Sequence, residues 1–330
     1  MKRVVSGVKP TGDVTLGNYV GAMKRWGEMS REAEREHFFF IPNLHALTSR
    51  PRSDDLARWT RSAVAWLLAC GVDLEHSYIF AQSQVPAHSE LTWVLNNYTT
   101  VGELNRMTQF KDKAQKLGPE GQLVGLYDYP VMMAADILLY DADEVPVGDD
   151  QKQHVELTRD IATRFNNLHG QTFRVPQPTV QAEGARIMDL QDPSRKMSKS
   201  DDDLSGCILL MDDNATIERK IKRAVTDSGS QVAAGDDKPA LTNLLVIYSV
   251  LSGRGVAELE QQYVGRGYGD FKADLANLVV ATLEPLRQAH QQLMEAGNDR
   301  VDRVLERGHQ RASQLAEVKM AEVRQKLGLV

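Results

Sequence analysis

The chain has 330 residues, of which 42% are hydrophobic and 25% charged, and this composition is typical of a globular protein of about two domains. Its formal net charge of -6 and pI near 5.8 exclude a global positive field, so any contact with nucleic acid has to come from local patches.

The N-terminus and the cysteines indicate the compartment. The apolar residues before Gly7 are too few for a signal peptide, and the apolar stretch from Ala63 to Val72 is shorter than the roughly 20 residues that cross a bilayer. The two cysteines, Cys70 and Cys207, have no CxxC spacing, which excludes a disulfide framework and a cysteine zinc site. We therefore expect a cytoplasmic protein with no membrane partner.

Strands alternate with helices in the first part of the chain. Short apolar runs predict strands at residues 3–6, 38–41 and 77–81, the second buried on both faces. Helical periodicity follows at residues 19–26 and 54–70, with Ser53 as the expected N-cap of the second helix. This alternation predicts an α/β fold with a doubly wound parallel sheet, in which ligands bind beyond the carboxyl ends of the strands.

The remainder is predicted to be mainly helical. Residues 87–165 have a helical pattern with breaks at 117–121 and 145–148, residues 214–225 form an amphipathic helix, and residues 301–327 form a long one. We expect an α/β domain at 1–204 with a helical insert around 90–165, followed by an all-helical domain at 205–330.

The segment from Gly7 to Asn18 is a candidate phosphate-binding turn. Gly7 and Gly12 have the GxxxxG spacing of a P-loop, but Asp13 and Val14 stand where Lys-Ser/Thr is required, so a Walker NTPase is excluded. Backbone N–H groups and a following helix N-terminus can still bind phosphate oxygens. A tight turn before a capped helix explains the same residues.

Lys196-Met197-Ser198-Lys199-Ser200 offers two ammonium groups and two hydroxyls within five residues. Such a run is also typical of a solvated surface turn. On a mobile loop, however, these lysines could reach the phosphates of a nucleotide late and bind the transition state better than the ground state. Together with the glycine turn, the loop is suited to adenylyl transfer.

These motifs resemble those of a known family. Thr15-Leu16-Gly17-Asn18 resembles the HIGH motif, and residues 196–200 the KMSKS motif, of class I aminoacyl-tRNA synthetases. Residues 107–111, 129–140, 145–154 and 184–188 resemble segments of bacterial tryptophanyl-tRNA synthetases, in family order. The resemblance implies a Rossmann-like sheet of the HUP type and the substrates tryptophan, ATP with Mg²⁺, and tRNA(Trp). It also implies a homodimer joined near residues 91–113 and an anticodon-binding helical domain.

The resemblance assigns a tryptophan site. Asp136 would accept from the indole N–H, which agrees with the cost of burying a carboxylate in an apolar run unless something donates to it. Left unpaired, the same carboxylate would penalise phenylalanine. An N-capping or salt-bridged Asp136, and a purely structural His45, are the alternatives. The implied roles are apolar walls for Met133, Val145 and Val147, the α-ammonium group for Tyr129 and Gln151, and the pocket lining for Gly7 and His45.

The resemblance also assigns an ATP site. Gly148, Asp149 and Asp150 would bind the ribose, and the backbone at Ile187 with Met197 would frame the adenine. The phosphates would contact Lys9, Pro10, Thr11, Thr15, Gly17, Asn18, Lys196, Ser198, Lys199 and Ser200. The candidate catalytic residues are Lys196, Lys199, Lys111 and Asn18.

The chain departs from the usual family pattern at several positions. Lys9 stands where glutamine is common, Val5 where phenylalanine is common, and Asn43-Leu44 precede His45 where Asp-Gln is usual. These changes concern the pocket rather than the reaction class.

Three other functions stay open at this point. An aspartate could equally accept from a phenol O–H, which allows a tyrosyl-tRNA synthetase. A paralogue could bind tryptophan or RNA without charging tRNA, although intact Lys196 and Lys199 argue against a pure binder. A nucleotidyltransferase for a small metabolite would not explain the helical domain. The basic face with Arg219, Lys220, Lys222 and Arg223 is a candidate RNA contact or a solvated helix face.

Overall fold

The fold is built on one parallel sheet. The computed structural model describes residues 1–10, 12–108, 123–180, 186–199 and 203–329. In this part of the chain five parallel strands have the order β3-β2-β1-β4-β5. The strands are β1 (Lys2–Gly7), β2 (Arg35–Ile41), β3 (Ser77–Ala81), β4 (Glu144–Val147) and β5 (Gln177–Val180).

The three predicted strands are β1, β2 and β3. The segment of β4 was expected only as a break between helices, and β5 was not expected at all. Both are four residues long, and Pro146 and Pro178 lie inside them. Because proline lowers strand propensity and marks turns, these segments carry no alternating strand signal.

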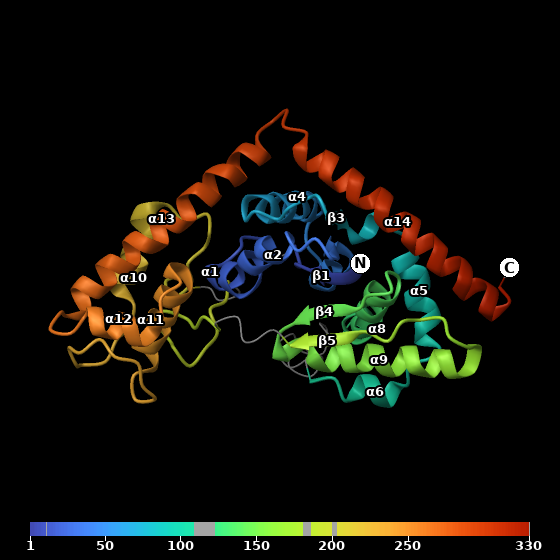
Figure 1. Cartoon of the computed structure of the whole chain (residues 1–330), viewed down its shortest axis with the longest axis horizontal. Helices are drawn as coiled ribbons and strands as arrows, with labels where there is room; N and C mark the ends of the chain where they lie inside the picture. Colours follow the sequence, from blue (N-terminus) through green and yellow to red (C-terminus); the bar gives the residue numbers. More distant parts are fainter. Residues whose placement is uncertain (11, 109–122, 181–185, 200–202, 330) are drawn as a thin grey trace.

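Helices surround the sheet (Figure 1). Those in the first part of the chain are α1 (Leu16–Asn18), α2 (Lys24–Met29), α3 (Asn43–Ala46), α4 (Ser53–Ala69), α5 (Ala87–Asn96), α6 (Val101–Asn105), α8 (Val124–Leu138) and α9 (Asp149–His169). A π-helical stretch, η1 (Tyr19–Met23), joins α1 to α2, and the 3₁₀ turns η2 (Leu47–Ser49) and η3 (Gln82–Gln84) follow α3 and β3. The later helices are α10 (Asn214–Arg223), α11 (Pro239–Ser252), α12 (Val256–Gln262), α13 (Tyr268–Met294) and α14 (Arg300–Leu327).

Apolar side chains cover both faces of the sheet. Phe38 and Phe40 of β2 pack in one buried cluster with residues of α5 and α8, whereas Phe39 and Ile41 pack in another with residues of α2 and α4. Since successive strand residues point to opposite faces, this division confirms the predicted doubly wound sheet with a strand buried on both sides.

Two helix ends differ from the predictions. The helix α4 begins at Ser53, so the N-cap is Arg52, which makes no side-chain capping bond. The helix α10 ends at Arg223, and Val225, expected on its apolar side, is exposed.

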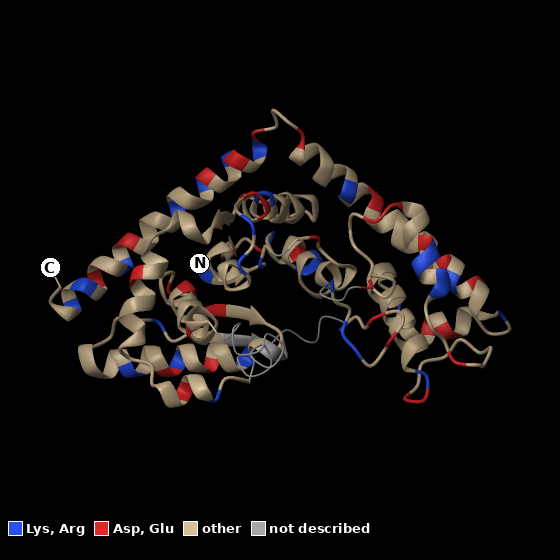
Figure 2. Ribbon diagram, turned by 180° about the vertical axis from the view of Figure 1, so that it is seen from behind, with Lys and Arg blue, Asp and Glu red and all other residues tan. Residues whose placement is uncertain are grey.

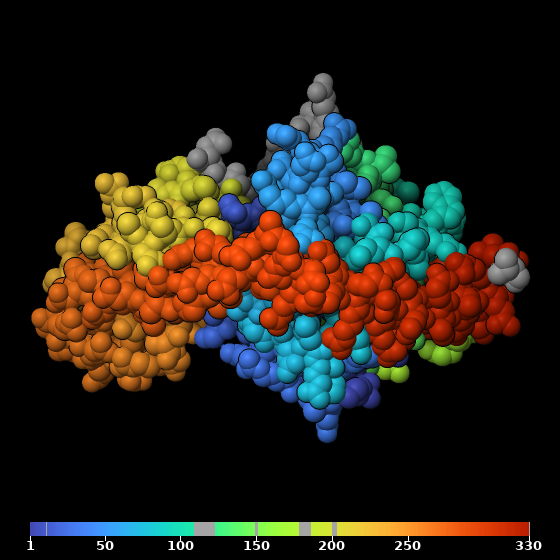
Figure 3. Space-filling model, turned by 90° about the horizontal axis from the view of Figure 1, so that it is seen from above, coloured from blue at the N-terminus to red at the C-terminus, as the bar shows by residue number. Residues whose placement is uncertain are grey.

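The last two helices form the long ridge of the molecule (Figures 1 and 3). Helix α13 packs on α10 and α11 and also contacts α4. Helix α14 runs on from the end of α13 to the α/β domain, where it packs on β3. There Arg311 pairs with Glu36 of β2 at 2.8 Å, and the buried Lys319 donates to the carbonyl oxygen of Thr172 at 2.6 Å. The final helix is therefore fastened to the α/β domain.

No single helix of the described residues has the length and apolar composition to cross a membrane; α11 and α12 meet that criterion only when taken together, as a pair bent by 105°.

Replacing Gly308 of α14 by alanine tests the packing of α14 on β3. A Cβ at Gly308 would lie 2.0 Å from the carbonyl oxygen of Ile79 in β3, so the helix has to move away from the sheet. We expect Gly308→Ala to lower the free energy of unfolding by about 1–3 kcal/mol or more, as overpacking does, in urea titrations. The matched control is Gly269→Ala on α13, where the added methyl meets open space and helix propensity predicts a gain of up to about 1 kcal/mol. Equal effects of the two substitutions would contradict this close packing.

Candidate active site

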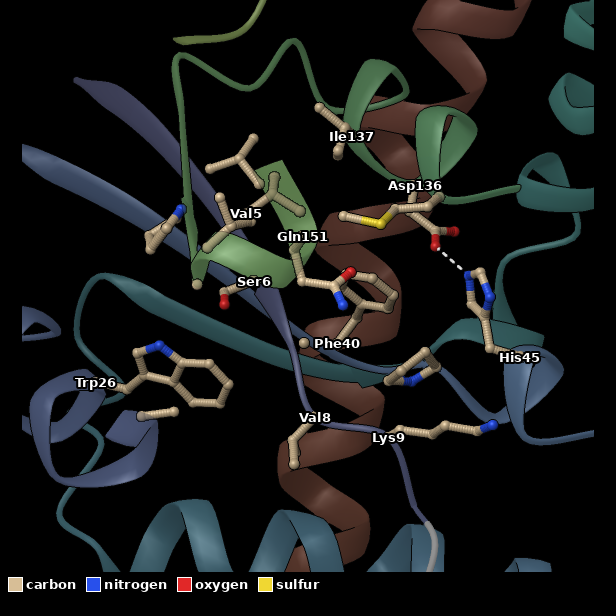
Figure 4. Close-up of a pocket in the computed structure, with 18 of the residues that line it drawn as sticks. Val5, Ser6, Val8, Lys9, Trp26, Phe40, His45, Asp136, Ile137 and Gln151 are labelled. Atoms are coloured by element: carbon tan, nitrogen blue, oxygen red, sulfur yellow. Dashed lines mark hydrogen bonds and ion pairs between the residues drawn. The ribbon is translucent and has the colours of Figure 1, made fainter. Parts of the chain in front are cut away.

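A cavity opens where the strand order changes direction. From β1 the sheet extends to β2 on one side and to β4 on the other, so the carboxyl ends of β1 and β4 diverge. The cavity between them has a volume of about 420 Å³ (Figure 4). It is lined by Ser6 and Gly7 at the end of β1 and Val8 after it, and by Val147 at the end of β4 and Gly148 after it. This is the position in which open α/β sheets bind their ligands.

All eight residues predicted to bind tryptophan line this cavity. They are Gly7, His45, Tyr129, Met133, Asp136, Val145, Val147 and Gln151. They come from β1, α3, α8, β4 and α9, so only the fold brings them together. The aromatic side chains of Trp26 and Phe40, which the sequence did not single out, complete the apolar wall (Figure 4). At Gly7 a Cβ would lie 2.9 Å from the Phe40 carbonyl oxygen, so a side chain there would displace the neighbouring strand.

Asp136 is fully buried at one end of the cavity and has three donors. Its Oδ1 accepts from Gln82 Nε2 at 2.7 Å and pairs with His88 Nδ1 at 2.6 Å, while its Oδ2 pairs with His45 Nε2 at 2.8 Å. Burial by itself would raise the pKa of Asp136, but the hydrogen bonds from His45 and His88 outweigh it and lower the pKa to about 2. The carboxylate is therefore ionised at neutral pH.

These donors show that Asp136 is paired within the protein, as the alternative of a salt-bridged aspartate expects. The bond from an indole N–H stays a prediction. A carboxylate has about four lone-pair positions, and the contacts from described residues use both on Oδ1 and one on Oδ2. One position on Oδ2 is left for a donor from a ligand.

Tyr129 and Gln151, the residues predicted to bind the α-ammonium group, also line the cavity. The Tyr129 hydroxyl lies 2.9 Å from Nε2 of the buried His154, and the His45 ring packs edge-on against Tyr129. Gln151 is in the first turn of α9 and projects into the cavity beside Phe40 in Figure 4. Tyr129 and Gln151 thus add a hydroxyl and an amide to a cavity that Trp26, Phe40, Met133 and the valines of β4 make largely apolar.

A second cavity of about 250 Å³ adjoins the first through Val8, Lys9 and Asn18, which line both. It lies between the segment from Gly7 to Asn18, here called the glycine turn, and the segment that begins at Lys196, here called the lysine-serine loop. The predicted ATP-binding residues that line it are Lys9, Pro10, Thr15, Asn18, Met197, Ser198 and Lys199. Lys9, whose Nζ is 3.3 Å from Thr48 Oγ1, puts an ammonium group at the junction of the two cavities.

Thr15 and Asn18 form a reciprocal cap. The Asn18 backbone N–H donates to Thr15 Oγ1, and the Thr15 backbone N–H donates to Asn18 Oδ1, each at 3.1 Å. The capped helix considered as an alternative is therefore present, and both residues line the second cavity as well.

Lys199 closes the far side of this cavity. Its ammonium group donates to the Asp13 carbonyl oxygen at 2.6 Å, and burial lowers its pKa. The backbone of the loop is tied to the same region, since the Met197 N–H donates to the Ile187 carbonyl oxygen at 3.0 Å. Downstream, the Leu210 N–H donates to Val14 and the Leu16 N–H to Ile208, both at 2.8 Å. The glycine turn and the segment after the lysines thus form one bonded unit.

The other predicted ATP-binding residues have different positions. Lys196 is exposed and lines neither cavity. A Cβ at Gly17 would lie 3.7 Å from Ile187 Cβ and 3.8 Å from Met197 Cβ, so these three residues are neighbours. Gly148 lines the first cavity. Thr11, Lys111 and Ser200, and the side chains of Asp149 and Asp150, lie outside the described residues.

Sequence reasoning missed the residues behind Asp136, namely Gln82, His88 and Tyr140. Gln82 directly follows β3, at the edge of the sheet where parallel strands place ligand-binding residues, and this was the available signal. Nothing in the local pattern marks His88, whereas Tyr140 ends the segment 129–140 that resembles the family.

Comparisons with known proteins identify the family. The family described as class I tRNA synthetases for W and Y matches residues 1–284. A tryptophan–tRNA ligase from Clostridium tetani is 47% identical over all of this chain and 96% of its own length, and one from Leifsonia xyli is 48% identical over 99% and 97%. This chain belongs to the bacterial tryptophanyl-tRNA synthetase family. The Rossmann-like fold and the helical C-terminal part predicted for that family are confirmed.

Solved structures agree with the family over the full chain. Tryptophanyl-tRNA synthetase from Mycoplasma pneumoniae superposes with a TM-score of 0.90 at 35% identity, covering 100% of this chain and 98% of that one. The enzyme from Campylobacter jejuni, in complex with ADP and tryptophan, has a TM-score of 0.83 at 36% identity and 99% coverage of both chains. A tyrosyl-tRNA synthetase from Aeropyrum pernix, at 22% identity and a TM-score of 0.67, shares the fold.

Proposed function

We propose that this aminoacyl-tRNA synthetase is a tryptophan–tRNA ligase that acts in the cytoplasm. It activates tryptophan with ATP to tryptophanyl-adenylate and pyrophosphate, then transfers the amino acid to tRNA(Trp). The observation that carries the proposal is the pair of adjoining cavities, one apolar with a buried carboxylate and the other bordered by Lys199.

The first cavity is suited to tryptophan. The indole ring would lie among Phe40, Met133 and the valines of β4, with its N–H donating to the remaining lone pair of Asp136 Oδ2. The α-ammonium group would contact the oxygens of Tyr129 and Gln151. The substrate carboxylate would then point toward Lys9, where the two cavities join.

The second cavity is suited to the triphosphate of ATP. The substrate carboxylate attacks the α-phosphorus, the bond to the bridging oxygen breaks, and pyrophosphate leaves. Mg²⁺ would enter with ATP as part of the substrate and would offset negative charge on the triphosphate, beside the ammonium groups of Lys9 and Lys199. Lys199 would leave the Asp13 carbonyl oxygen for the charge that develops on the departing pyrophosphate, an interaction stronger in the transition state than in the ground state. Positioning and electrostatics carry this step without a protein nucleophile.

In the second step the terminal ribose hydroxyl of tRNA attacks the acyl carbon of the adenylate, the bond from this carbon to the phosphate oxygen breaks, and AMP leaves. The catalytic domain would comprise residues 1–204 with the insert around 90–165, and the helical residues 205–330 would bind the anticodon. Basic side chains on α10 are the candidate backbone contacts (Figure 2). Lys222 is exposed, whereas Lys220 is paired with Asp212 at 2.7 Å, which makes Lys220 a poorer candidate than its neighbours.

Pyrophosphate exchange with a panel of amino acids tests the function directly. We expect ATP–pyrophosphate exchange with tryptophan and at least about 100-fold slower exchange with phenylalanine, since a site built to bond a donor rejects a ligand without one. Tyrosine has a phenol O–H donor, and we expect its exchange to be slower because its single ring leaves part of the space for the indole unfilled. Faster exchange with tyrosine would establish the tyrosyl alternative. Tryptophan binding without exchange for any amino acid would establish the non-charging paralogue.

Replacing Lys199 by alanine tests the transition-state role. We expect the rate of adenylate formation, measured in single turnovers, to fall by about 100-fold or more with little change in the Kd for tryptophan. Lys222→Ala on α10 is the control, because that exposed lysine has no part in a tRNA-free reaction. A Lys199→Ala enzyme with the wild-type rate would remove this residue from the mechanism.

Replacing Trp93 by arginine tests the proposed homodimer. Trp93 of α5, Val101 of α6 and Val124 of α8 are 74%, 66% and 81% exposed, and both α5 and α6 contact α8, so together these side chains offer the kind of apolar patch that a partner covers. A second copy would bury this face, near the predicted interface at 91–113. We expect sedimentation equilibrium to give a dimer for the wild type and a monomer for Trp93→Arg, whereas Val318→Arg on the outer side of α14, 72% exposed before substitution, should remain dimeric. A wild-type monomer at micromolar concentration would contradict the proposal.

A further inference from the structure

Behind the cavity, Asp136 is the first member of a fully buried chain of three side chains. His88 of α5 lies between Asp136 and Tyr140, with 2.6 Å from its Nδ1 to Asp136 Oδ1 and 2.8 Å from its Nε2 to the Tyr140 hydroxyl oxygen. All three residues have 0% exposure. Neither His88 nor Tyr140 lines the cavity, so neither can contact a ligand there.

The hydrogens in this chain have one arrangement that satisfies every group. The ionised Asp136 only accepts, so Nδ1 of His88 carries a proton. Burial, and next the charge of Asp136, raise the pKa of Tyr140, which keeps its hydroxyl protonated. Among the described residues this hydroxyl has His88 Nε2 as its hydrogen-bond partner, so it donates to that nitrogen and the imidazole is neutral.

Aromatic packing keeps the chain rigid. The Tyr140 ring stacks on Phe38 with 5.3 Å between centroids and meets Phe80 edge-on at 5.6 Å. The His88 ring stacks on Phe40 at 6.1 Å. With His88 and Gln82 both directed at Oδ1, rotation of the carboxylate would break two bonds, and Oδ2 is held on the cavity side next to His45.

We propose that Tyr140 and His88 are positioning residues for amino-acid selection. They hold the Asp136 carboxylate in the orientation in which its Oδ2 accepts a hydrogen bond from an N–H of the substrate ring. This proposal rests on the proposed function. It goes further by assigning part of the selectivity to two residues that never contact the substrate.

The Tyr140→Phe variant tests it, because that change removes one hydroxyl and keeps the stacked ring. The probes are tryptophan and its analogue β-(3-benzothienyl)alanine, in which sulfur replaces the indole N–H, and their Kd values are measured by calorimetry. We expect the wild type to bind tryptophan more tightly than the analogue. In the variant the preference for tryptophan, measured as the ratio of the two Kd values, should be about tenfold smaller, because the Kd for tryptophan rises while that for the analogue stays unchanged. A purely structural role would weaken both ligands equally and leave their ratio as it is, which would overturn the proposal.

Tyr78→Phe is the matched control. Its ring also stacks on Phe38, at 5.5 Å between centroids, but it lies on β3 outside the chain of hydrogen bonds, so the ratio should stay at the wild-type value. A wild type that binds both ligands equally would overturn the indole contact and this proposal together. A wild type that discriminates, with a Tyr140→Phe variant that discriminates just as well, would overturn the positioning role alone.

A second measurement determines the protonation of His88 and does not depend on whether Tyr140→Phe folds. Two-bond ¹H–¹⁵N correlation spectra of histidine-labelled wild-type protein report the tautomer of each ring, with His88 assigned by the signal lost in His88→Gln. We expect a neutral ring with its proton on Nδ1. A doubly protonated His88, or a proton on Nε2, would overturn the proposal.

Discussion

The central place of β1 in the parallel sheet is the constraint on which the site depends. Because the sheet continues to β2 on one side and to β4 on the other, the ends of β1 and β4 separate and leave a space that neither strand fills. Gly7 keeps the end of β1 close to β2, since a Cβ there would meet the Phe40 carbonyl oxygen. Helices from distant parts of the chain converge on this opening, and their side chains determine what the cavity can bind.

A charge inside an apolar space is the second constraint. Asp136 is stable there because donors from α3, α5 and η3 reach it from three directions. His45 lines the cavity whereas His88 and Gln82 lie behind it, so the bonds that offset the cost of burial also join the cavity wall to the residues behind it. These bonds therefore stabilise the fold at the residue proposed to select the substrate.

The lysine-serine loop is coupled to the helical part of the chain in a comparable way. Residues 207–210 bond to the glycine turn at Val14 and Leu16, and α10 begins four residues further on. Helix α13 packs against both α10 and α4, and α14 is fastened to the sheet through Glu36 and Thr172. The helices that would bind RNA are thus connected, through these contacts, to the cavity that Lys199 lines.

The sequence by itself determined the sheet type, the long helices and the family, because apolar periodicity and contiguous motifs are local properties. It also named Asp136 and the residues that share its cavity, through the motifs that they resemble. Only the tertiary structure decided β4 and β5, whose prolines hide the strand pattern, and the return of α14 to the sheet. It alone showed that Asp136 is bonded to His88 and Gln82, because hydrogen bonds between segments some 50 residues apart in the chain depend on packing, which no local pattern encodes.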